Sequence, residues 1–519
     1  MAIKIILLVI FFSVMVGIGI FCRRKAVDVN GFVLGGRAVG PWLTAFAYGT
    51  SYFSAVVFVG YAGQFGWRFG IAATWAGIGN ALLGSLLAWA VLGRRTRVMT
   101  QHLDSATMPE FFGRRFGSPS LKIAASAVTF IFLIPYTASL YNGLSRLFGL
   151  AFNIDYSVCV IAMAILTGVY VIAGGYMATA INDFIQGIIM LFGICAVVVA
   201  VLKTQGGFME ALNGLAAVTD ENVSSAPGIF NSFFGPDPIN LLGVVLLTSL
   251  GTWGLPQMVQ KFYAIKSEKS IGTGMIVSTV FALIVAGGCY FLGGFGRLFS
   301  GSMEVVNGVP VGGYDSIIPT MLSGLPDLLI ALVVILVLSA SMSTLSSIVL
   351  TSSSTLTLDL LKGHVFKKMD EKRQVLVMRC LIVVFIGISV VMALIQYKSS
   401  VTFIAQLMGV SWGALAGAFL APFLYGLYWK RTTKVACWTS FVFSTVFMLA
   451  VISPLKTYLP ALLQSPINAG AFCMIVGLII VPVVSLFTPA PGKELVEGAF
   501  SCYEQKVTAR RRDTLGDVE

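Results

Sequence analysis

Apolar segments long enough to cross a lipid bilayer recur along the whole chain. The hydrocarbon core of a bilayer is about 30 Å thick, so a spanning helix needs roughly 20 mostly apolar residues. The pattern therefore predicts an all-α polytopic membrane protein with about 13 transmembrane helices. The expected spans are residues 3–22, 42–65, 71–92, 121–147, 156–174, 182–202, 239–263, 274–298, 327–358, 375–396, 401–429, 434–452 and 467–487.

Two of these expected helices carry residues that interrupt a helix at mid-membrane. Helix 42–65 has Gly49 followed by several hydroxyl residues, and helix 239–263 has two glycines and Pro256 within six residues. Each begins a block of five helices, and matched broken helices in two halves are typical of an inverted-repeat transporter with a midplane site. Small-residue helix packing in the first case and a simple Pro kink in the second remain alternatives.

The pattern predicts a division of the chain around two five-helix repeats. The first apolar segment has no small-residue cleavage site and is followed by Arg23-Arg24-Lys25, so it is expected to be retained as a helix. The expected parts are the first helix with a cytoplasmic loop (1–41), the first repeat (42–205), an extracellular loop (206–238), the second repeat (239–430), two further helices (431–488) and a cytoplasmic tail (489–519).

Composition agrees with a protein whose main solvent is lipid. The chain is 57% hydrophobic and 11% charged, whereas charged residues make up about 25% of soluble domains. The net charge of +12 could suggest nucleic acid, but the basic residues are concentrated in alternate loops. We expect Lys261, Lys266 and Lys269 to lie in one of these basic loops. By the positive-inside rule we expect the N-terminus outside and the C-terminus in the cytoplasm.

These features predict a multi-pass protein of the cell membrane that contacts the lipid bilayer, binds no nucleic acid and functions as a monomer. The eight cysteines form no C-x-x-C pair, which argues against a disulfide framework and a zinc site. His102 and His364 fall in basic loops and are expected to be solvated. The sequence carries no Walker pair, metalloprotease helix or nucleophile elbow. We therefore expect neither an enzyme nor an ATP-driven pump.

A hydroxyl-rich segment in helix 327–358 is a candidate cation site. Ala340, Ser343, Thr344 and Ser347 are spaced i, i+3, i+4 and i+7, so they share one helical face, and Ser346 lies beside them. Hard cations take oxygen ligands, and neutral hydroxyls with carbonyls give a site weak enough to release its ion. A hydroxyl-lined packing face is the alternative.

A carboxylate also falls inside the predicted membrane region. Asn182 and Asp183, followed by Gln186, begin helix 182–202. A carboxylate at membrane depth requires a cation, a hydrogen-bond donor or water. Capping of the helix N-terminus, where the helix dipole favours negative charge, explains the same residues equally well.

Four segments of the chain occur in a specific order. They are Phe32-Val33-Leu34-Gly35-Gly36-Arg37, Asn182-Asp183 with Gln186, Ala340 to Ser347, and Ser411-Trp412-Gly413 through Tyr428-Trp429-Lys430-Arg431. In this order they make residues 5–435 similar to the sodium:solute symporter family, which includes sodium/proline, sodium/sugar, pantothenate and sialic acid transporters. The resemblance implies the five-plus-five inverted-repeat fold shared with the leucine transporter.

The resemblance also implies sodium as the coupling ion, one or two ions per cycle. Its main sodium site would use the backbone carbonyls of Thr50, Phe53 and Ala340 with the hydroxyls of Ser343 and Thr344. Some members have a second sodium site. Its ligands would fall on Asp183, Ser343, Ser346 and Ser347.

The resemblance is less specific about the solute. Tyr136 matches an aromatic residue of the proline transporters, but their tryptophan falls on Val56, and the polar pair of the sugar members falls on Val56 and Val57. We expect sodium-coupled import, by alternating access, of a small polar organic solute, an amino acid or carboxylate-type nutrient rather than a sugar. The candidate solute residues are Ser54, Val57, Asn80, Tyr136, Asn142, Trp253 and Gln257.

Two other functions remain open from the sequence. One is a proton-coupled transporter of the same fold, for which Asp183 is the candidate titrating group. The other is a membrane sensor or channel that does not accumulate a solute.

Overall fold

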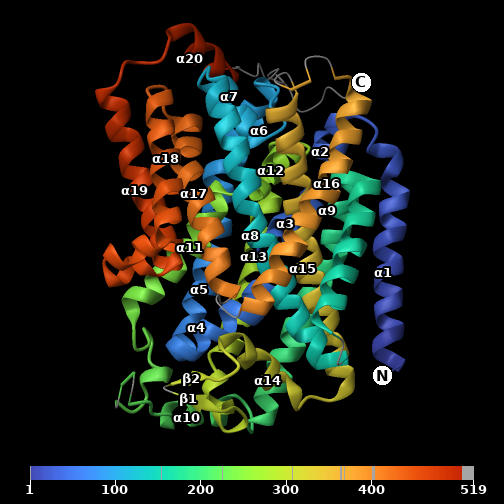
Figure 1. Ribbon diagram of the computed structural model, residues 1–519, viewed down its shortest axis with the longest axis vertical. Helices are drawn as coiled ribbons and strands as arrows, with labels where there is room; N and C mark the ends of the chain where they lie inside the picture. The colour runs from blue at the N-terminus through green and yellow to red at the C-terminus, as the bar shows by residue number, and fades with distance from the viewer. Residues whose placement is uncertain are drawn as a thin grey trace, which may run out of the picture.

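A computed structural model describes residues 2–504 except 153–154, 222, 225, 307, 363–364, 367–368 and 400–403. His364 and the tail 505–519 therefore lie outside the described residues. The described chain is mainly an upright bundle of helices (Figure 1). The N-terminus and α20 (Lys493–Phe500) lie at opposite ends of that bundle. Which end faces the cytoplasm stays a prediction.

The first half of the chain contains eleven of the α-helices and the short helical turns between them, labelled η. In order they are α1 (Ala2–Cys22), η1 (Arg23–Lys25), α2 (Val29–Leu34), η2 (Gly35–Arg37), α3 (Pro41–Tyr52), η3 (Val56–Tyr61), α4 (Ala62–Phe69), η4 (Gly70–Ala73), α5 (Thr74–Gly79), η5 (Asn80–Leu87), η6 (Trp89–Gly93), α6 (Arg94–His102), α7 (Met108–Arg115), α8 (Pro119–Phe152), α9 (Tyr156–Thr204), α10 (Phe208–Ala217), η7 (Ile229–Asn231) and α11 (Pro238–Gly254).

The second half continues the bundle and adds one short hairpin. Its elements are α12 (Pro256–Ala264), α13 (Lys269–Gly293), η8 (Gly296–Ser302), β1 (Val305–Val306), β2 (Val309–Pro310), η9 (Tyr314–Ser316), α14 (Ile317–Ser323), α15 (Asp327–Thr355), η10 (Leu356–Leu361), α16 (Glu371–Ser399), α17 (Ile404–Tyr428), α18 (Lys434–Ile452), η11 (Pro454–Tyr458), η12 (Ala461–Gln464), α19 (Pro466–Phe487), α20 and η13 (Ser501–Tyr503).

Ten of the described helical segments are long and apolar enough to cross a membrane, or eleven if α11 and α12 are one bent span. Two of these ten segments are unusually long. The helix α9 has 49 residues, and the continuous helical run Val56–His102 has 47. A straight helix of 49 residues would measure roughly 74 Å, more than twice the hydrocarbon thickness. The predicted number of 13 crossings stays a prediction.

The long helix α9 turns at Gly175. This residue has φ 55° and ψ −149°, a backbone conformation that residues other than glycine rarely adopt. A Cβ there would lie 2.8 Å from the carbonyl oxygen of Phe32. The expected boundary between helices 156–174 and 182–202 therefore coincides with a sharp turn rather than with an exposed loop.

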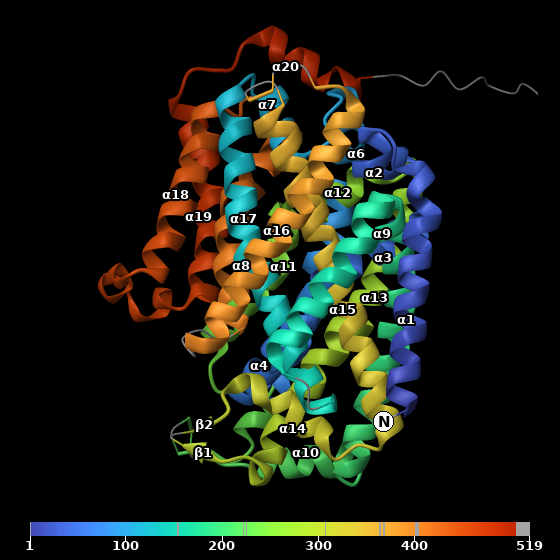
Figure 2. The same ribbon diagram turned by 45° about the vertical axis from the view of Figure 1, so that its right-hand side comes forward.

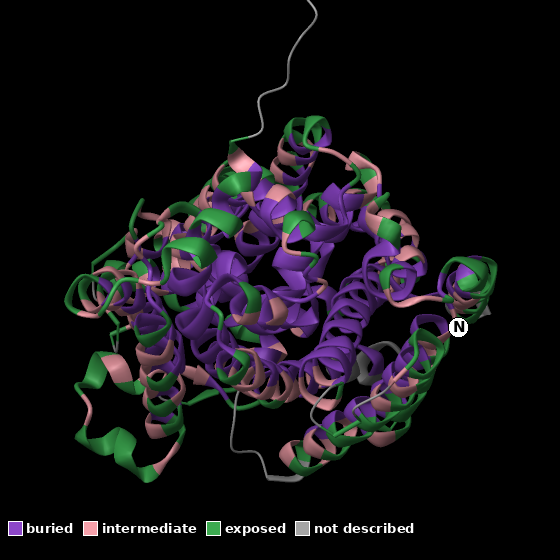
Figure 3. Cartoon of the chain, turned by 90° about the horizontal axis from the view of Figure 1, so that it is seen from above, coloured by how far each residue is buried: buried purple, intermediate pink, exposed green. Residues whose placement is uncertain are grey.

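Burial increases toward the middle of the bundle (Figure 3). Within its most apolar window, α17 is 94% buried, whereas the window of α1 is 22% buried. The helices α11, α18 and α19 pack around α17, and α1 packs on α9 at the edge of the bundle (Figure 2). Exposed apolar side chains on α1 and other outer helices suit contact with acyl chains rather than water.

Both predicted helix interruptions are confirmed. After α3, Phe53 has extended backbone angles, and the helix starts again when the amides of Val57 and Phe58 donate to the carbonyl oxygen of Ser54. Between α11 and α12, Leu255 is extended and the two helices bend by 47°. The first break lies one turn beyond Gly49, where the sequence suggested that unwinding would begin.

The end of the bundle that holds the N-terminus carries additional small elements. They are α10, α14 and the antiparallel pair β1–β2, in which Val305 pairs with Pro310 and Val306 with Val309 (Figure 2). The helix α10 lies in the expected extracellular loop 206–238, and β1, β2 and α14 lie between the expected helices 274–298 and 327–358.

Candidate ion and solute site

The break after α3 lies against the hydroxyl-rich face of α15. The Ser343 Oγ lies 3.2 Å from the carbonyl oxygen of Thr50. The Thr344 Oγ1 lies 3.1 Å from the same oxygen and 3.3 Å from that of Phe53. Both hydroxyls also lie 3.1 Å from the carbonyl oxygen of Ala340. The five residues of the predicted main sodium site are therefore brought together.

The backbone explains why these carbonyls are available. The last carbonyls of a helix have no intrahelical partner, and α3 ends at Tyr52. Thr50 and Phe53 therefore direct carbonyl oxygens toward α15 instead of toward a following helical turn. The cluster is buried, and it carries three carbonyls and two hydroxyls without a formal charge. This donor set fits a small hard cation that has to be released again.

The predicted second site contains a cation supplied by the protein. The Lys261 Nζ donates to the Ser347 Oγ at 2.9 Å and lies 3.9 Å from Asp183 Oδ2. Asp183 is 0% exposed and Lys261 is 1% exposed. The Ser347 hydroxyl also lies 2.9 Å from that of Ser51. The ammonium group is thus held between α9, α12 and α15.

The assignment of Lys261 to a basic loop is wrong. It lies inside α12, which continues to Ala264, so its side chain points into the bundle. Its Nζ also lies 5.1 Å from the ring centroid of Tyr176, a favourable place for a cation. The pattern of apolar and polar residues does not distinguish a lysine in the last turn of a helix from a lysine in the loop that follows.

The capping interpretation of Asp183 is also wrong. Asp183 lies in the interior of α9, eight residues beyond the turn at Gly175, so it cannot cap an N-terminus. The Ser346 hydroxyl donates to the carbonyl oxygen of Ser343 in its own helix at 2.9 Å. A second sodium at Asp183, Ser343, Ser346 and Ser347 stays a prediction, and Lys261 is the group that such an ion would meet there.

Two of the seven candidate solute residues have polar groups without a partner. Both side-chain polar atoms of Gln257 and the hydroxyl of Tyr136 are buried and make no hydrogen bond to the described residues. The indole N–H of Trp412 is in the same situation, and its ring meets that of Tyr136 edge-on at 5.9 Å. Buried polar groups nearly always have partners, so these three side chains are candidates for contact with a polar solute.

Trp412 was missed as a candidate for the solute site. It belongs to the Ser411-Trp412-Gly413 motif that carried part of the family resemblance, but it was used there only for recognition. A Cβ on Gly251 would lie 2.5 Å from the Trp412 ring. The indole is therefore packed directly on α11, just before the break at Leu255.

The other solute candidates are engaged in packing between helices or local turns. Asn80 accepts from the Ser249 hydroxyl at 3.3 Å, and Trp253 donates to the Leu83 carbonyl at 2.9 Å. Asn142 donates to Gln396 and accepts from Tyr156. The Ser54 hydroxyl accepts from the Val56 amide. The Val57 carbonyl accepts from the Cys289 thiol.

A cavity of about 570 Å³ lies at the end of the bundle that carries the N-terminus. Pro135, the neighbour of Tyr136, lines it, together with the basic residues Arg68 and Lys456. Its other lining residues are Gln64, Tyr314, Met392, Gln406, Leu407, Val410, Val451, Ile452, Gln464, Ser465, Pro466 and Ile467. The cavity offers amide groups and positive charge beside Tyr136.

The opposite end of the bundle is closed by backbone and arginine contacts. Arg37 donates to the carbonyl oxygens of Ser105 at 2.6 Å and Tyr263 at 3.2 Å. Val39 and Ile265 form a β-bridge, and the Arg97 Nε donates to the Ile265 carbonyl at 2.5 Å. Burial lowers the pKa of the Arg37 guanidinium, and the positive charge of Arg97 lowers it further. These contacts join the start of α3 to the end of α12.

The chain is similar to known transport proteins along nearly its whole length. The osmoregulated proline transporter OpuE of Bacillus subtilis (strain 168) is 28% identical over 95% of this chain and 96% of its own length. A sodium/proline symporter of Staphylococcus aureus (strain JH9) is 28% identical over 94% of this chain and 93% of its own.

A solved structure of a Na⁺-coupled sialic acid symporter in a substrate-bound outward-open state has the same fold. It matches with a TM-score of 0.74 at 16% identity, over 95% of this chain and 99% of that one. The family pattern "Sodium:solute symporter family" matches residues 32–442. The chain is therefore a multi-pass membrane transport protein that belongs to the sodium:solute symporter family.

Proposed function

We propose that this protein is a sodium-driven symporter that imports a small polar organic solute by alternating access. The observation that carries the proposal is the convergence of three carbonyls and two hydroxyls between the α3 break and α15. The proposed architecture has 13 crossings, two five-helix repeats that begin with the two broken helices, and an external N-terminus.

Sodium at this cluster would couple ion and solute through the backbone of α3. The ion would draw the carbonyls of Thr50 and Phe53 toward Ser343 and Thr344, and so fix the broken helix against α15. Ser54 begins the next helical turn, so the same backbone segment belongs to both the ion site and the solute region. Such coupling is reciprocal: the solute tightens sodium binding by the same factor as sodium tightens solute binding.

One sodium ion supplies enough energy for accumulation. An ion moving down a potential of about 100 mV gains about 2.3 kcal/mol, and a tenfold gradient adds about 1.4 kcal/mol. The sum supports accumulation of a neutral solute by several hundred-fold.

We propose one sodium per cycle, because Lys261 occupies the second position. Its ammonium group bonds to Ser347 and pairs with Asp183, two residues that a second sodium would use. A second ion in the same place would meet a fixed positive charge in a low-dielectric interior, where like charges repel strongly.

We propose an amino acid or a related small carboxylate as the solute. Trp412, Tyr136 and Gln257 offer aromatic surface with unpaired polar groups. Arg68 and Lys456 in the adjacent cavity supply positive charge for a carboxylate on its way to the site. The two relatives named as proline transporters support the same class.

Uptake into proteoliposomes tests the proposal. With an inward Na⁺ gradient and clamped pH, we expect labelled proline or another amino acid to accumulate above its external concentration. Accumulation driven only by an H⁺ gradient would replace sodium coupling by proton coupling. Saturable binding without accumulation across a panel of amino acids, carboxylates and sugars would indicate a sensor instead.

A further inference from the structure

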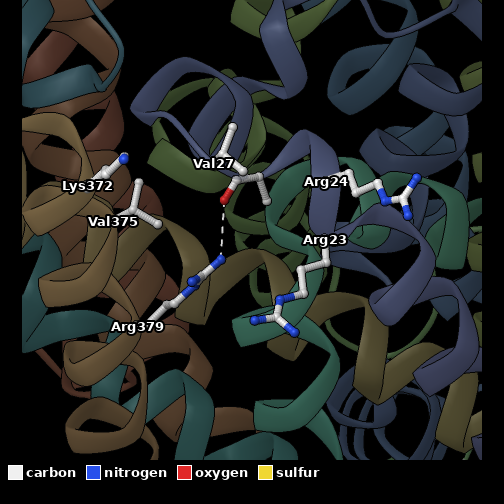
Figure 4. Close-up of a pocket in the computed structure, with 7 residues that line it drawn as sticks. Arg23, Arg24, Val27, Lys372, Val375 and Arg379 are labelled. Atoms are coloured by element: carbon white, nitrogen blue, oxygen red, sulfur yellow. Dashed lines mark hydrogen bonds between the residues drawn. The ribbon is translucent and has the colours of Figure 1, made fainter.

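A basic cavity of about 510 Å³ lies away from the ion and solute site, between η1 and α16. It is lined by Arg23, Arg24, Lys372 and Arg379, together with Ala26, Val27 and Val375. Arg23 and Arg379 extend toward one another, whereas Arg24 turns to the other side of η1 (Figure 4). Neither the transport cycle nor the family motifs use these residues.

The positive charges around this cavity are not neutralised within the described part of the chain. None of the four basic residues forms an ion pair there. Arg379 donates one hydrogen bond, from Nη2 to the Ala26 carbonyl at 3.2 Å (Figure 4). Its Nε is buried without a partner. Guanidinium groups held beside one another repel, and an anion between them removes that cost.

The cavity lies at the level where the membrane surface is expected. Arg23 directly follows the last turn of α1, and Phe21 in that turn is 79% exposed. On the other side, Leu376 in the first turns of α16 is 59% exposed. A ligand at this position therefore meets basic groups and lipid-facing apolar side chains together, which suits a lipid better than a free ion.

We propose that this cavity binds the phosphoryl headgroup of an anionic membrane lipid. Arginines form forked hydrogen bonds with phosphoryl oxygens, and basic pockets between membrane helices on the cytoplasmic side hold anionic headgroups. The headgroup lies between Arg23 and Arg379 with Lys372 beside it, and the acyl chains lie along α1 and α16. The bound lipid ties the peripheral helix α1 to α16.

Lipid retention on the purified full-length protein tests this site. In native mass spectrometry with phosphatidylglycerol, we expect one lipid to be retained and the Tm to rise. Phosphatidylcholine, which has no net charge, should do neither. The double variant Arg23→Gln/Arg379→Gln should weaken phosphatidylglycerol binding about 25-fold, at about fivefold per removed charge. Lys434 is an exposed basic residue at the start of α18. The control variant Lys434→Gln should bind phosphatidylglycerol as the wild type does.

Three results would overturn the proposal. Equal retention of phosphatidylcholine would show that charge is not recognised. Undiminished phosphatidylglycerol binding by the double variant, with a wild-type Tm in the absence of lipid, would place the lipid elsewhere. An equal rise in Tm with inorganic phosphate alone would identify a soluble anion as the ligand.

Discussion

At the scale of single residues, Thr344 is the group that joins the two sides of the candidate sodium site. Its hydroxyl lies within hydrogen-bond distance of carbonyls from both α3 and α15. Replacing it by alanine removes one oxygen from a buried cluster, and a hydrogen bond or ligand to a charged group contributes about 1.5–3 kcal/mol.

We therefore expect Thr344→Ala to raise the sodium concentration for half-maximal uptake about tenfold to hundredfold. Thr344→Ser should restore most of the affinity, because it keeps the oxygen. Thr357→Ala is a matched control, since that buried hydroxyl donates to the Ser353 carbonyl one turn earlier, away from the candidate sodium site. Equal sodium dependence in Thr344→Ala and Thr357→Ala would place the ion elsewhere.

Lys261 gives a second prediction at this scale. Lys261→Met leaves Asp183 buried without its partner, which costs about 3–5 kcal/mol when nothing replaces the charge. We expect this variant to be destabilised without sodium, to be rescued by sodium, and to take up two sodium ions per solute where the wild type takes up one.

The double variant Lys261→Met/Asp183→Asn separates charge from packing. Because it removes both charges, we expect it to return to one sodium per solute and to lose the sodium-dependent rescue. The readouts are Tm against sodium concentration and the flux ratio of ²²Na⁺ to solute. A wild type that already carries two ions would refute the role of Lys261, while the main site and sodium coupling would still stand.

At the scale of elements, the close contact between α4 and α13 holds the part of the broken segment that follows the break in place. A Cβ on Gly66 would lie 1.9 Å from the carbonyl oxygen of Gly293, and one on Gly293 would lie 2.1 Å from that of Ala62. No side chain fits between these backbones, so α4 continues from the break along a path fixed by α13.

We expect Gly293→Ala to lower the stability of the purified protein by about 1–3 kcal/mol, because a buried methyl group must push two helices apart. Gly287→Ala tests the same substitution in the same helix, where a Cβ meets nothing within 4 Å. That control should be neutral or slightly stabilising, since alanine favours helix over glycine. The measurement is the Tm of both variants in detergent. An equal fall in Tm for Gly293→Ala and Gly287→Ala would contradict the close-contact explanation.

At the scale of the whole molecule, the two ends of the bundle differ. The end with the N-terminus holds the 570 Å³ cavity, and the other end is closed around Arg37. Such an asymmetry is expected of a transporter whose solute pathway is closed at one end, here the end that we predict to be cytoplasmic. Arg37 joins three separate segments, through Thr100, Ser105 and Tyr263.

We expect Arg37→Gln to shift the protein toward states open at that end. Ser353 is buried near the C-terminal end of α15. In a Ser353→Cys background, this position should react faster with an impermeant thiol reagent in Arg37→Gln than in the parent. Exposed Cys195 and Cys380 are replaced by serine in both. Arg94→Gln, which loses one exposed ion pair with Glu268, serves as control. Unchanged labelling would show that Arg37 does not hold the closure.

The sequence by itself determined the class of the protein and the hydroxyl face of the candidate ion site. Spans of apolar residues and the i, i+3, i+4, i+7 hydroxyl face are local patterns that bilayer thickness and helix geometry dictate. The interruptions of helices 42–65 and 239–263 were also visible locally, as runs of small residues, hydroxyls and Pro256, although the first break lies one turn beyond Gly49. The partnership of Thr50 with Ser343 came from the family resemblance, not from a pattern.

Only the tertiary structure decided which residues far apart in the chain meet. It placed Lys261 against Asp183 and Ser347, and Arg23 beside Arg379. It also placed the Trp412 ring edge-on against that of Tyr136. Such contacts depend on how each helix is rotated and packed against its neighbours, and local periodicity does not encode this. A lysine that looks like a loop residue becomes an internal cation because α12 extends one turn beyond it.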